Sequence, residues 1–139
     1  MSLSQAKADE LLALAKEAAR KEVFTWLHNT RQEELVVALD DREIEFLLSL
    51  KRSPFEITAQ LRTRDRNFPL ARIDNAAQHV NPDGEVLRGP HIHWYREGDG
   101  LAWASLVDWY DPTRPMDTLV KFMDLIAARF PYGITEDML

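Results

Sequence analysis

The sequence contains no cysteine. Disulfide bonds, thiol nucleophiles, cysteine-ligated zinc and iron–sulfur clusters are therefore excluded, and the composition suits a reducing compartment. The longest apolar runs extend over only a few residues. Such runs are too short for a membrane span or for the apolar region of a signal peptide, so we expect a cytoplasmic protein without a membrane partner.

Positive charge is scarce as well. The chain carries 17 Lys and Arg against 23 Asp and Glu, which gives a formal net charge of −6 at pH 7. This balance disfavours a protein that binds nucleic acid or anionic lipid over its whole surface, although it is compatible with a local basic face. With 139 residues, 45% of them hydrophobic, the chain is long enough for one globular α+β domain, which we expect to span residues 1–139.

Apolar residues recur with a helical period near both ends of the chain. The first stretch covers residues 4–20 and begins at Ser4, a suitable N-cap. The second is an amphipathic pattern over residues 116–130, with Pro115 in the first turn and Pro131 after the last. These patterns predict one helix at each end of the domain.

Between the two helices, short apolar segments alternate with polar turns, which is typical of an antiparallel meander. The predicted strands cover residues 23–27, 35–39, 44–50, 55–63, 68–74, 91–97 and 101–107. Because no helix separates them, the chain does not fit a doubly wound nucleotide-binding sheet. We predict an α+β fold: a single antiparallel meander sheet of about five to seven strands, with an N-terminal and a C-terminal helix packed on one face.

Segment 91–97 places two histidines on one strand. Side chains alternate between the two faces of a strand, so His91, His93, Tyr95 and Glu97 are expected to share one face. One face of an antiparallel sheet commonly packs on the core while the other meets solvent. We therefore predict that these polar side chains lie on the open face.

Arginines in the preceding strands give this face a catalytic interpretation. Two imidazoles and an arginine can cleave RNA without a metal, because one imidazole removes the proton of the 2′-hydroxyl and the other protonates the leaving oxygen, while the guanidinium stabilises the charged phosphorus centre. The predicted catalytic residues are His91, His93, Arg72 and Tyr95, the last as a hydrogen-bond donor or stacking platform. The predicted ligand-binding residues are Arg62, Asp74, His79 and Glu97.

Residues 75–90 form a long connection, which we predict to be a loop over the polar face. It would bring His79 to that face, and Gly89-Pro90 would fix how the chain reaches His91. The run Asn81-Pro82-Asp83-Gly84 within it predicts a tight turn.

The same histidines allow two other interpretations. His91 and His93 could ligate a zinc ion together with His79, Asp74 or Glu97. No zinc-hydrolase signature is present, so the sequence by itself assigns no cofactor. Alternatively, the histidines only hydrogen-bond neighbouring loops and have a structural role.

Three short motifs carry a resemblance to a known family. They are R-x-D at residues 72–74, H-x-N-P-D-G at 79–84 and H-I-H-x-Y-x-E-G at 91–98. In these motifs the chain resembles a family of small uncharacterised bacterial proteins. The resemblance implies no mechanism; it implies that the characteristic positions are Asp74, His79, His91, His93, Tyr95 and Glu97. A looser likeness of residues 90–93 to small proteins encoded beside toxin–antitoxin genes suggests, by analogy, a defence or mobile-element context.

Three functions follow, in order of preference. The first is a metal-independent phosphodiester hydrolase that acts on RNA or another phosphate-bearing ligand. The second is a non-catalytic protein-binding module, such as an antitoxin or a phage-defence accessory, which the acidic total charge favours. The third is a metal-dependent hydrolase. The oligomeric state does not follow from the sequence.

Overall fold

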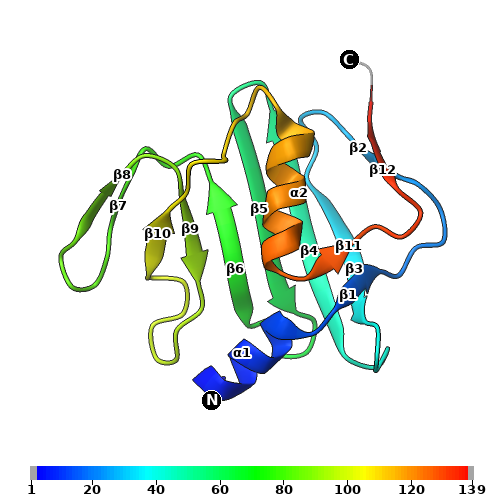
Figure 1. Ribbon diagram of the computed structural model, residues 1–139, viewed down its shortest axis with the longest axis horizontal. Coiled ribbons are helices and arrows are strands. Elements are labelled where there is room, and N and C mark those ends of the chain that lie inside the picture. Colours follow the sequence, from blue (N-terminus) through cyan, green and yellow to red (C-terminus); the bar gives the residue numbers. More distant parts are fainter. Residues whose placement is uncertain (1–2, 138–139) are drawn as a thin grey trace.

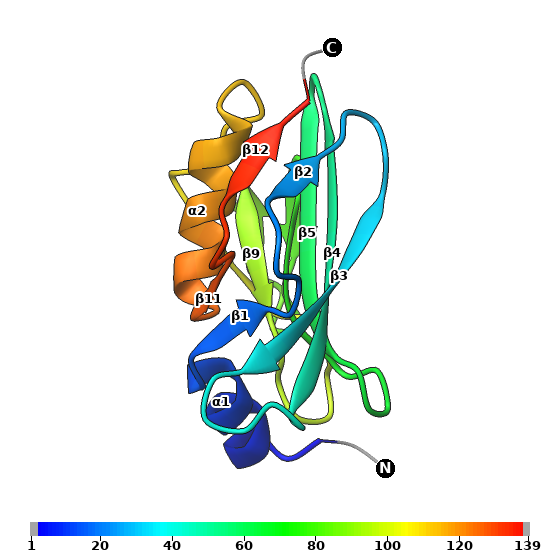
Figure 2. The same ribbon diagram turned by 90° about the vertical axis from the view of Figure 1, so that its right-hand side faces the viewer.

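A sheet of eight strands forms the body of the protein, of which the computed structural model describes residues 3–137. Helix α2 covers one face of this sheet, and α1 packs at one end of it (Figure 1). Figure 2 shows both helices on the same side of the sheet, together with the short strands β2 and β12. The other face, which carries no helix within residues 3–137, is called the uncovered face below.

The elements have the following bounds. The helices are α1 (Gln5–Ala13) and α2 (Pro115–Leu125). The strands are β1 (Lys16–Ala18), β2 (Phe24–Trp26), β3 (Gln32–Ala38), β4 (Glu45–Ser53), β5 (Glu56–Thr63), β6 (Pro69–Asp74), β7 (Gln78–Val80), β8 (Val86–Arg88), β9 (His91–Trp94), β10 (Ala104–Leu106), β11 (Ala128–Arg129) and β12 (Ile134–Glu136). No helix in the described part of the chain is long and apolar enough to cross a bilayer.

The large sheet has the strand order β10-β9-β6-β5-β4-β3-β1-β11. Its neighbours are antiparallel except β1 and β11, which run parallel. The α+β class and the two helices on one side are confirmed. The prediction of a purely antiparallel sheet of five to seven strands is wrong, because two segments expected to be helical form the last two strands at one side of the sheet, β1 and β11. A further predicted strand, β2, pairs with β12 outside the large sheet.

The two helices are shorter than their apolar patterns predict. Ser4 caps α1 as expected, since its Oγ accepts a hydrogen bond from the Lys7 amide at 3.1 Å. Helix α1 nevertheless ends at Ala13 rather than at residue 20, and α2 ends at Leu125 rather than at residue 130. Ala127 then adopts a left-handed backbone conformation, with φ of 56°, and the chain turns into β11. Tertiary contacts therefore override the helical period at both ends.

Lys16 makes the contacts that join the two helix ends. Its Nζ donates to the carbonyls of Leu12 at 2.9 Å, Leu14 at 2.8 Å and Ile126 at 2.8 Å. The side chain is 1% exposed and lies over the ring of Phe46, with Nζ 5.1 Å from the centroid. Burial lowers the pKa of Lys16 to about 8. Three carbonyls satisfy the three N–H groups of the ammonium, so the charge is buried with full hydrogen bonding.

Replacing Lys16 tests this role. Lys16→Met keeps the apolar stem but leaves three carbonyls without their donor, so we expect the free energy of unfolding to fall by about 3 kcal/mol. The matched control is Lys121→Met on the exposed side of α2, which should change stability by less than about 0.5 kcal/mol. Urea unfolding followed by circular dichroism measures both, and equal midpoints would contradict the role of Lys16.

The predicted apolar set of β5 lies under α2. Ile57, Ala59 and Leu61 are fully buried with Phe122 of the helix. Because side chains alternate along a strand, the residues between them point to the uncovered face. Phe55, which was expected in the buried set, is 80% exposed because it lies in the turn before β5.

Candidate metal centre

Strand β9 places two histidines on the uncovered face. Ile92 between them is 2% exposed and belongs to the core, so His91 and His93 point the other way. On one side β9 pairs with β6, where Asp74 lies opposite His91 and Arg72 opposite His93. The expected neighbourhood of the histidines with Arg72 and Asp74 is therefore correct.

A β-hairpin brings the third histidine. Residues 75–90, expected to be a loop, contain the antiparallel pair β7 and β8, which projects beyond β9 and β10 in Figure 1. The predicted turn joins them, with the Gly84 amide donating to the Asn81 carbonyl at 2.8 Å and Gly84 at a φ of +92°. His79 on β7 faces the β9 histidines, as the sequence predicted.

Asn81 fastens this hairpin to β10. Its Oδ1 accepts from the Ala104 amide at 2.9 Å, and its Nδ2 donates to the Ala104 carbonyl at 3.0 Å. The side-chain amide thus pairs with β10 as a neighbouring strand would. Asn81 is 4% exposed, so these groups have little access to water that could replace the bonds.

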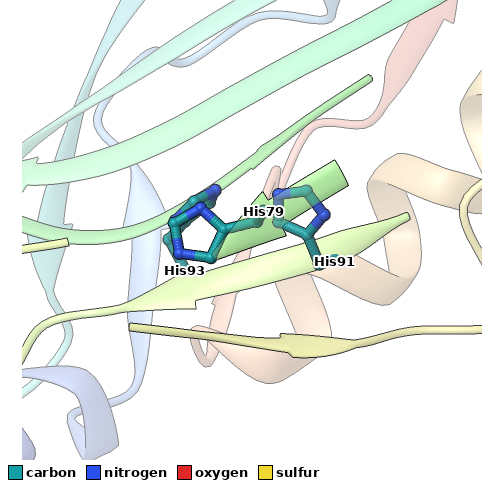
Figure 3. Close-up of side chains that lie close together, drawn as sticks. All are labelled: His79, His91 and His93. Carbon is teal, nitrogen blue, oxygen red and sulfur yellow. The ribbon is translucent and has the colours of Figure 1, made fainter. Parts of the chain in front are cut away.

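The three imidazole rings converge (Figure 3). The ring centroids are 4.8 Å apart for His79–His93 and His91–His93 and 5.3 Å apart for His79–His91. One nitrogen from each ring lies within 4.8 Å of the others, and among residues 3–137 no carboxylate belongs to this set. A divalent ion bound by nitrogen ligands of this kind is typically zinc or another late transition metal.

Backbone carbonyls determine which nitrogen of each ring carries a proton. His79 Nε2 lies 2.7 Å from the Ala102 oxygen, His91 Nδ1 2.9 Å from Gly89 O, and His93 Nδ1 2.9 Å from Leu101 O. A carbonyl oxygen only accepts, so each of these nitrogens is the donor. In the neutral ring the lone pair is then on the second nitrogen. A metal-ligating histidine has this arrangement, with its other N–H held by a carbonyl.

Burial affects two histidines of the cluster. His91 is completely buried, and its Nε2 has no hydrogen-bond partner in the part of the chain described. Burial lowers the pKa of His93, and the neighbouring His91 and His79 lower it further. The Leu101 carbonyl and the Asp74 carboxylate act in the opposite direction and do not cancel this effect. For His93 the form that binds metal ions, the neutral imidazole, is therefore favoured.

Arg72 and Asp74 lie beside the centre and pair with each other. Arg72 Nη2 is 2.9 Å from Asp74 Oδ2. The Arg72 side chain is 44% exposed, whereas that of Asp74 is 13% exposed. Arg72 can therefore reach a solute above the uncovered face while Asp74 holds one side of its guanidinium.

Tyr95 does not share the face of the histidines, which corrects its predicted catalytic role. Strand β9 ends at Trp94, so the alternation that placed Tyr95 beside His93 stops there. Tyr95 is instead buried in the core cluster, and its hydroxyl donates to the Leu3 carbonyl.

Glu97 and Arg62 also lie away from the three histidines. Glu97 Oε1 accepts from the Gln5 amide at 2.8 Å and so caps the first turn of α1. Arg62 is on β5, which β6 separates from β9, and it bonds Glu33 Oε1 at 2.6 Å and Ser49 Oγ at 2.7 Å. The predicted ligand-binding set therefore reduces to His79 and Asp74.

Sequence reasoning recognised only part of what supports the site. It treated Asn81 as a turn residue and gave no role to the carbonyls of Leu101 and Ala102. Gly89 had been given a role in presenting His91, and the structure confirms it: Gly89 has a φ of +117°, and its carbonyl accepts from His91 Nδ1. A residue with a side chain would be strained at that φ.

Comparison with known proteins places the chain in one family. The model of a family of unknown function, DUF6978, matches residues 3–127. The chain belongs to the DUF6978 family. This agrees with the expectation of an uncharacterised family. No curated protein matches this DUF6978 member, and no solved structure does.

The attachment of the hairpin can be tested at Asn81. Asn81→Ala leaves the Ala104 amide and carbonyl without partners, and we expect unfolding free energy to fall by about 2 kcal/mol. Hydrogen exchange at the Ala104 amide should accelerate because it loses its acceptor. Gln78→Ala, at an exposed position of the same hairpin, is the control and should leave both unchanged. Unaltered exchange in Asn81→Ala would show that this amide pair does not hold the hairpin.

Proposed function

We propose that this DUF6978 protein is a metal-dependent hydrolase with one divalent transition-metal ion, Zn²⁺ in the first instance. The ligands are His79 Nδ1, His91 Nε2 and His93 Nε2. One observation carries the proposal: three imidazoles from two separate segments converge, and each has its other nitrogen bonded to a backbone carbonyl.

A cluster of histidines with only a structural role does not account for this arrangement. Structural histidines normally have both ring nitrogens satisfied when they are buried. Here His91 Nε2 is buried without a partner among residues 3–137, next to two further rings with lone pairs. Zinc–nitrogen bonds of about 2.1 Å at a tetrahedral centre put ligand nitrogens about 3.4 Å apart. One nitrogen from each ring lies within 4.8 Å of the others, so the proposed ion requires the rings to move inward.

A three-histidine centre leaves the fourth tetrahedral position for water. A zinc ion lowers the pKa of such a water to about 7, so hydroxide is available near neutral pH. In the hydrolysis that we propose, the ion held by the three histidines would supply an activated water that displaces the leaving oxygen of a phosphodiester, and that oxygen would take a proton from solvent. Arg72, opposite His93, is placed to bind the phosphoryl oxygens.

The geometry gives less support to RNA cleavage without a metal. That mechanism needs His91 to exchange a proton with substrate, but the ring is completely buried and one nitrogen is bonded to Gly89 O. The mechanism without a metal also uses Tyr95 on the face of the histidines, but Tyr95 belongs to the core cluster. The burial of His91 is compatible with a role as metal ligand. The position of Tyr95 is that of a core residue.

Metal binding is the first test. Protein freed of metal by a chelator should bind one Zn²⁺ per chain, and zinc should raise its Tm because it binds only the folded state. Cobalt in its place should give the visible absorption of a tetrahedral site.

His79→Ala, which alters the hairpin and not β9, should lower zinc affinity at least 100-fold. His28→Ala removes the one histidine outside the cluster and should leave binding unchanged. The metal centre is disproved if the protein takes up no stoichiometric zinc, cobalt, nickel or manganese.

Hydrolysis is the second test. The zinc-loaded protein should hydrolyse bis(p-nitrophenyl) phosphate, and removal of zinc should abolish turnover. Arg72→Gln should lower kcat/KM by about 10- to 100-fold, as loss of a charged hydrogen bond to the reacting phosphoryl group predicts. Zinc stoichiometry should remain at one in this variant. A zinc-loaded protein without turnover on phosphodiesters or carboxylic esters would reject the hydrolase and leave the metal centre.

A further inference from the structure

A second feature of the uncovered face is a cleft of about 320 Å³ over β4 and β5. Three cationic side chains line it, and so do two hydroxyls and an amide. These residues are Arg31, Lys51, Arg72, Ser49, Thr58 and Gln60. A concave surface of this size and composition is suited to a polar small ligand or to part of a longer one.

The charge of the cleft is opposite to that of the protein. The chain has a formal net charge of −6, yet no Asp or Glu lines the cleft. Arg31 has a carboxylate at 3.7 Å, from Glu33, and Arg72 has Asp74 at 2.9 Å. Lys51 forms no ion pair with any residue from 3 to 137. Like charges held in a concavity attract an anion, and guanidinium and ammonium groups bind phosphate oxygens.

The sheet register connects this cleft with the metal centre. Ser49 pairs with Gln60, Gln60 with Arg72, and Arg72 with His93. Side chains of directly paired residues lie on the same face, so one polar row crosses β4, β5, β6 and β9. Neighbouring strands are about 4.8 Å apart, which puts His93 about 10 Å from Gln60 at the floor of the cleft. Arg72 belongs to both sites.

We propose that the cleft binds the phosphates of a short single-stranded oligonucleotide, whose scissile phosphodiester then lies at the three-histidine centre. This inference rests on the proposed function and specifies its substrate class. A single phosphate cannot extend over about 10 Å, whereas a chain of two or more nucleotides can. Arg31 and Lys51 bind phosphates that do not react, and Arg72 lies between them and the metal.

The test measures oligonucleotide binding and zinc binding in the same variants. The probes are a fluorescein-labelled uridine tetranucleotide and its DNA counterpart, with fluorescence anisotropy read on zinc-loaded protein at several salt concentrations. Replacing Arg31 and Lys51 together by Gln should weaken binding at least tenfold and reduce the salt slope by about 1.4, since two phosphate contacts with a single strand are lost. Zinc stoichiometry should remain at one per chain, because neither residue belongs to the cluster.

A matched variant removes the same charge elsewhere. Lys21→Gln with Lys121→Gln, both at exposed positions outside the cleft, should change the affinity for the probe less than twofold. Equal loss in the two double variants would overturn the inference, since net charge alone would then explain binding. Binding that Arg31→Gln with Lys51→Gln leaves unchanged would also overturn it.

The two proposals can fail separately. Cleft-dependent binding of the tetranucleotide by a protein that takes up no zinc supports the cleft and refutes the metal-dependent function. Stoichiometric zinc with no measurable binding of the tetranucleotide overturns the inference and leaves the proposed function standing. A preference for the RNA probe over the DNA probe would show that the 2′-hydroxyl is recognised as well.

Discussion

Strand β9 is held in register on both sides, by β6 and by β10, while the side chain of Ile92 lies in the core and those of His91 and His93 point away from it. A slip of one residue would turn His91 and His93 into the apolar layer under α2 and remove Ile92 from the core. The loss of buried apolar surface makes this register unfavourable. The position of both imidazoles is therefore a consequence of core packing. The hairpin that carries His79 depends on the same strands, because Asn81 pairs with Ala104 on β10.

Around this fixed strand, backbone carbonyls orient three imidazole rings so that the second nitrogen of each ring remains for a ligand. Each ring donates one N–H to a carbonyl, and these carbonyls come from the connections at either end of β9 and not from its own ladder. Burial and the neighbouring imidazoles lower the pKa of His93, which favours the neutral ring that binds a metal ion over a ring that carries a proton. This is the physical reason for preferring a metal centre to a pair of proton carriers.

Positive charge on the uncovered face lies beside the row of paired residues that runs from Ser49 through Gln60 and Arg72 to His93. The protein is acidic overall, and most of its arginines are neutralised in pairs such as Arg20–Glu34. In the row from Ser49 to His93, Arg72 also pairs with one carboxylate, that of Asp74, but its other side borders the cleft. A local field of this kind can attract a polyanion to one place on a molecule that repels it elsewhere. The acidic composition therefore does not exclude a phosphate-bearing ligand.

Local chemistry in the sequence determined the caps, turns and faces of this protein: the Ser4 cap, the Asn81–Gly84 turn and the outward direction of His91 and His93 depend on residues only a few positions apart. The outcomes that sequence reasoning missed depend on contacts between distant segments. Lys16 hydrogen-bonds the carbonyl of Leu12 in α1 and that of Ile126 after α2, and Tyr95 lies off the predicted face because β9 stops at Trp94. The meeting of His79 with the β9 histidines required the hairpin to be paired with β10. Only the tertiary structure decided these points, because periodicity specifies which face a side chain takes, while long-range hydrogen bonds specify where an element ends and what it meets.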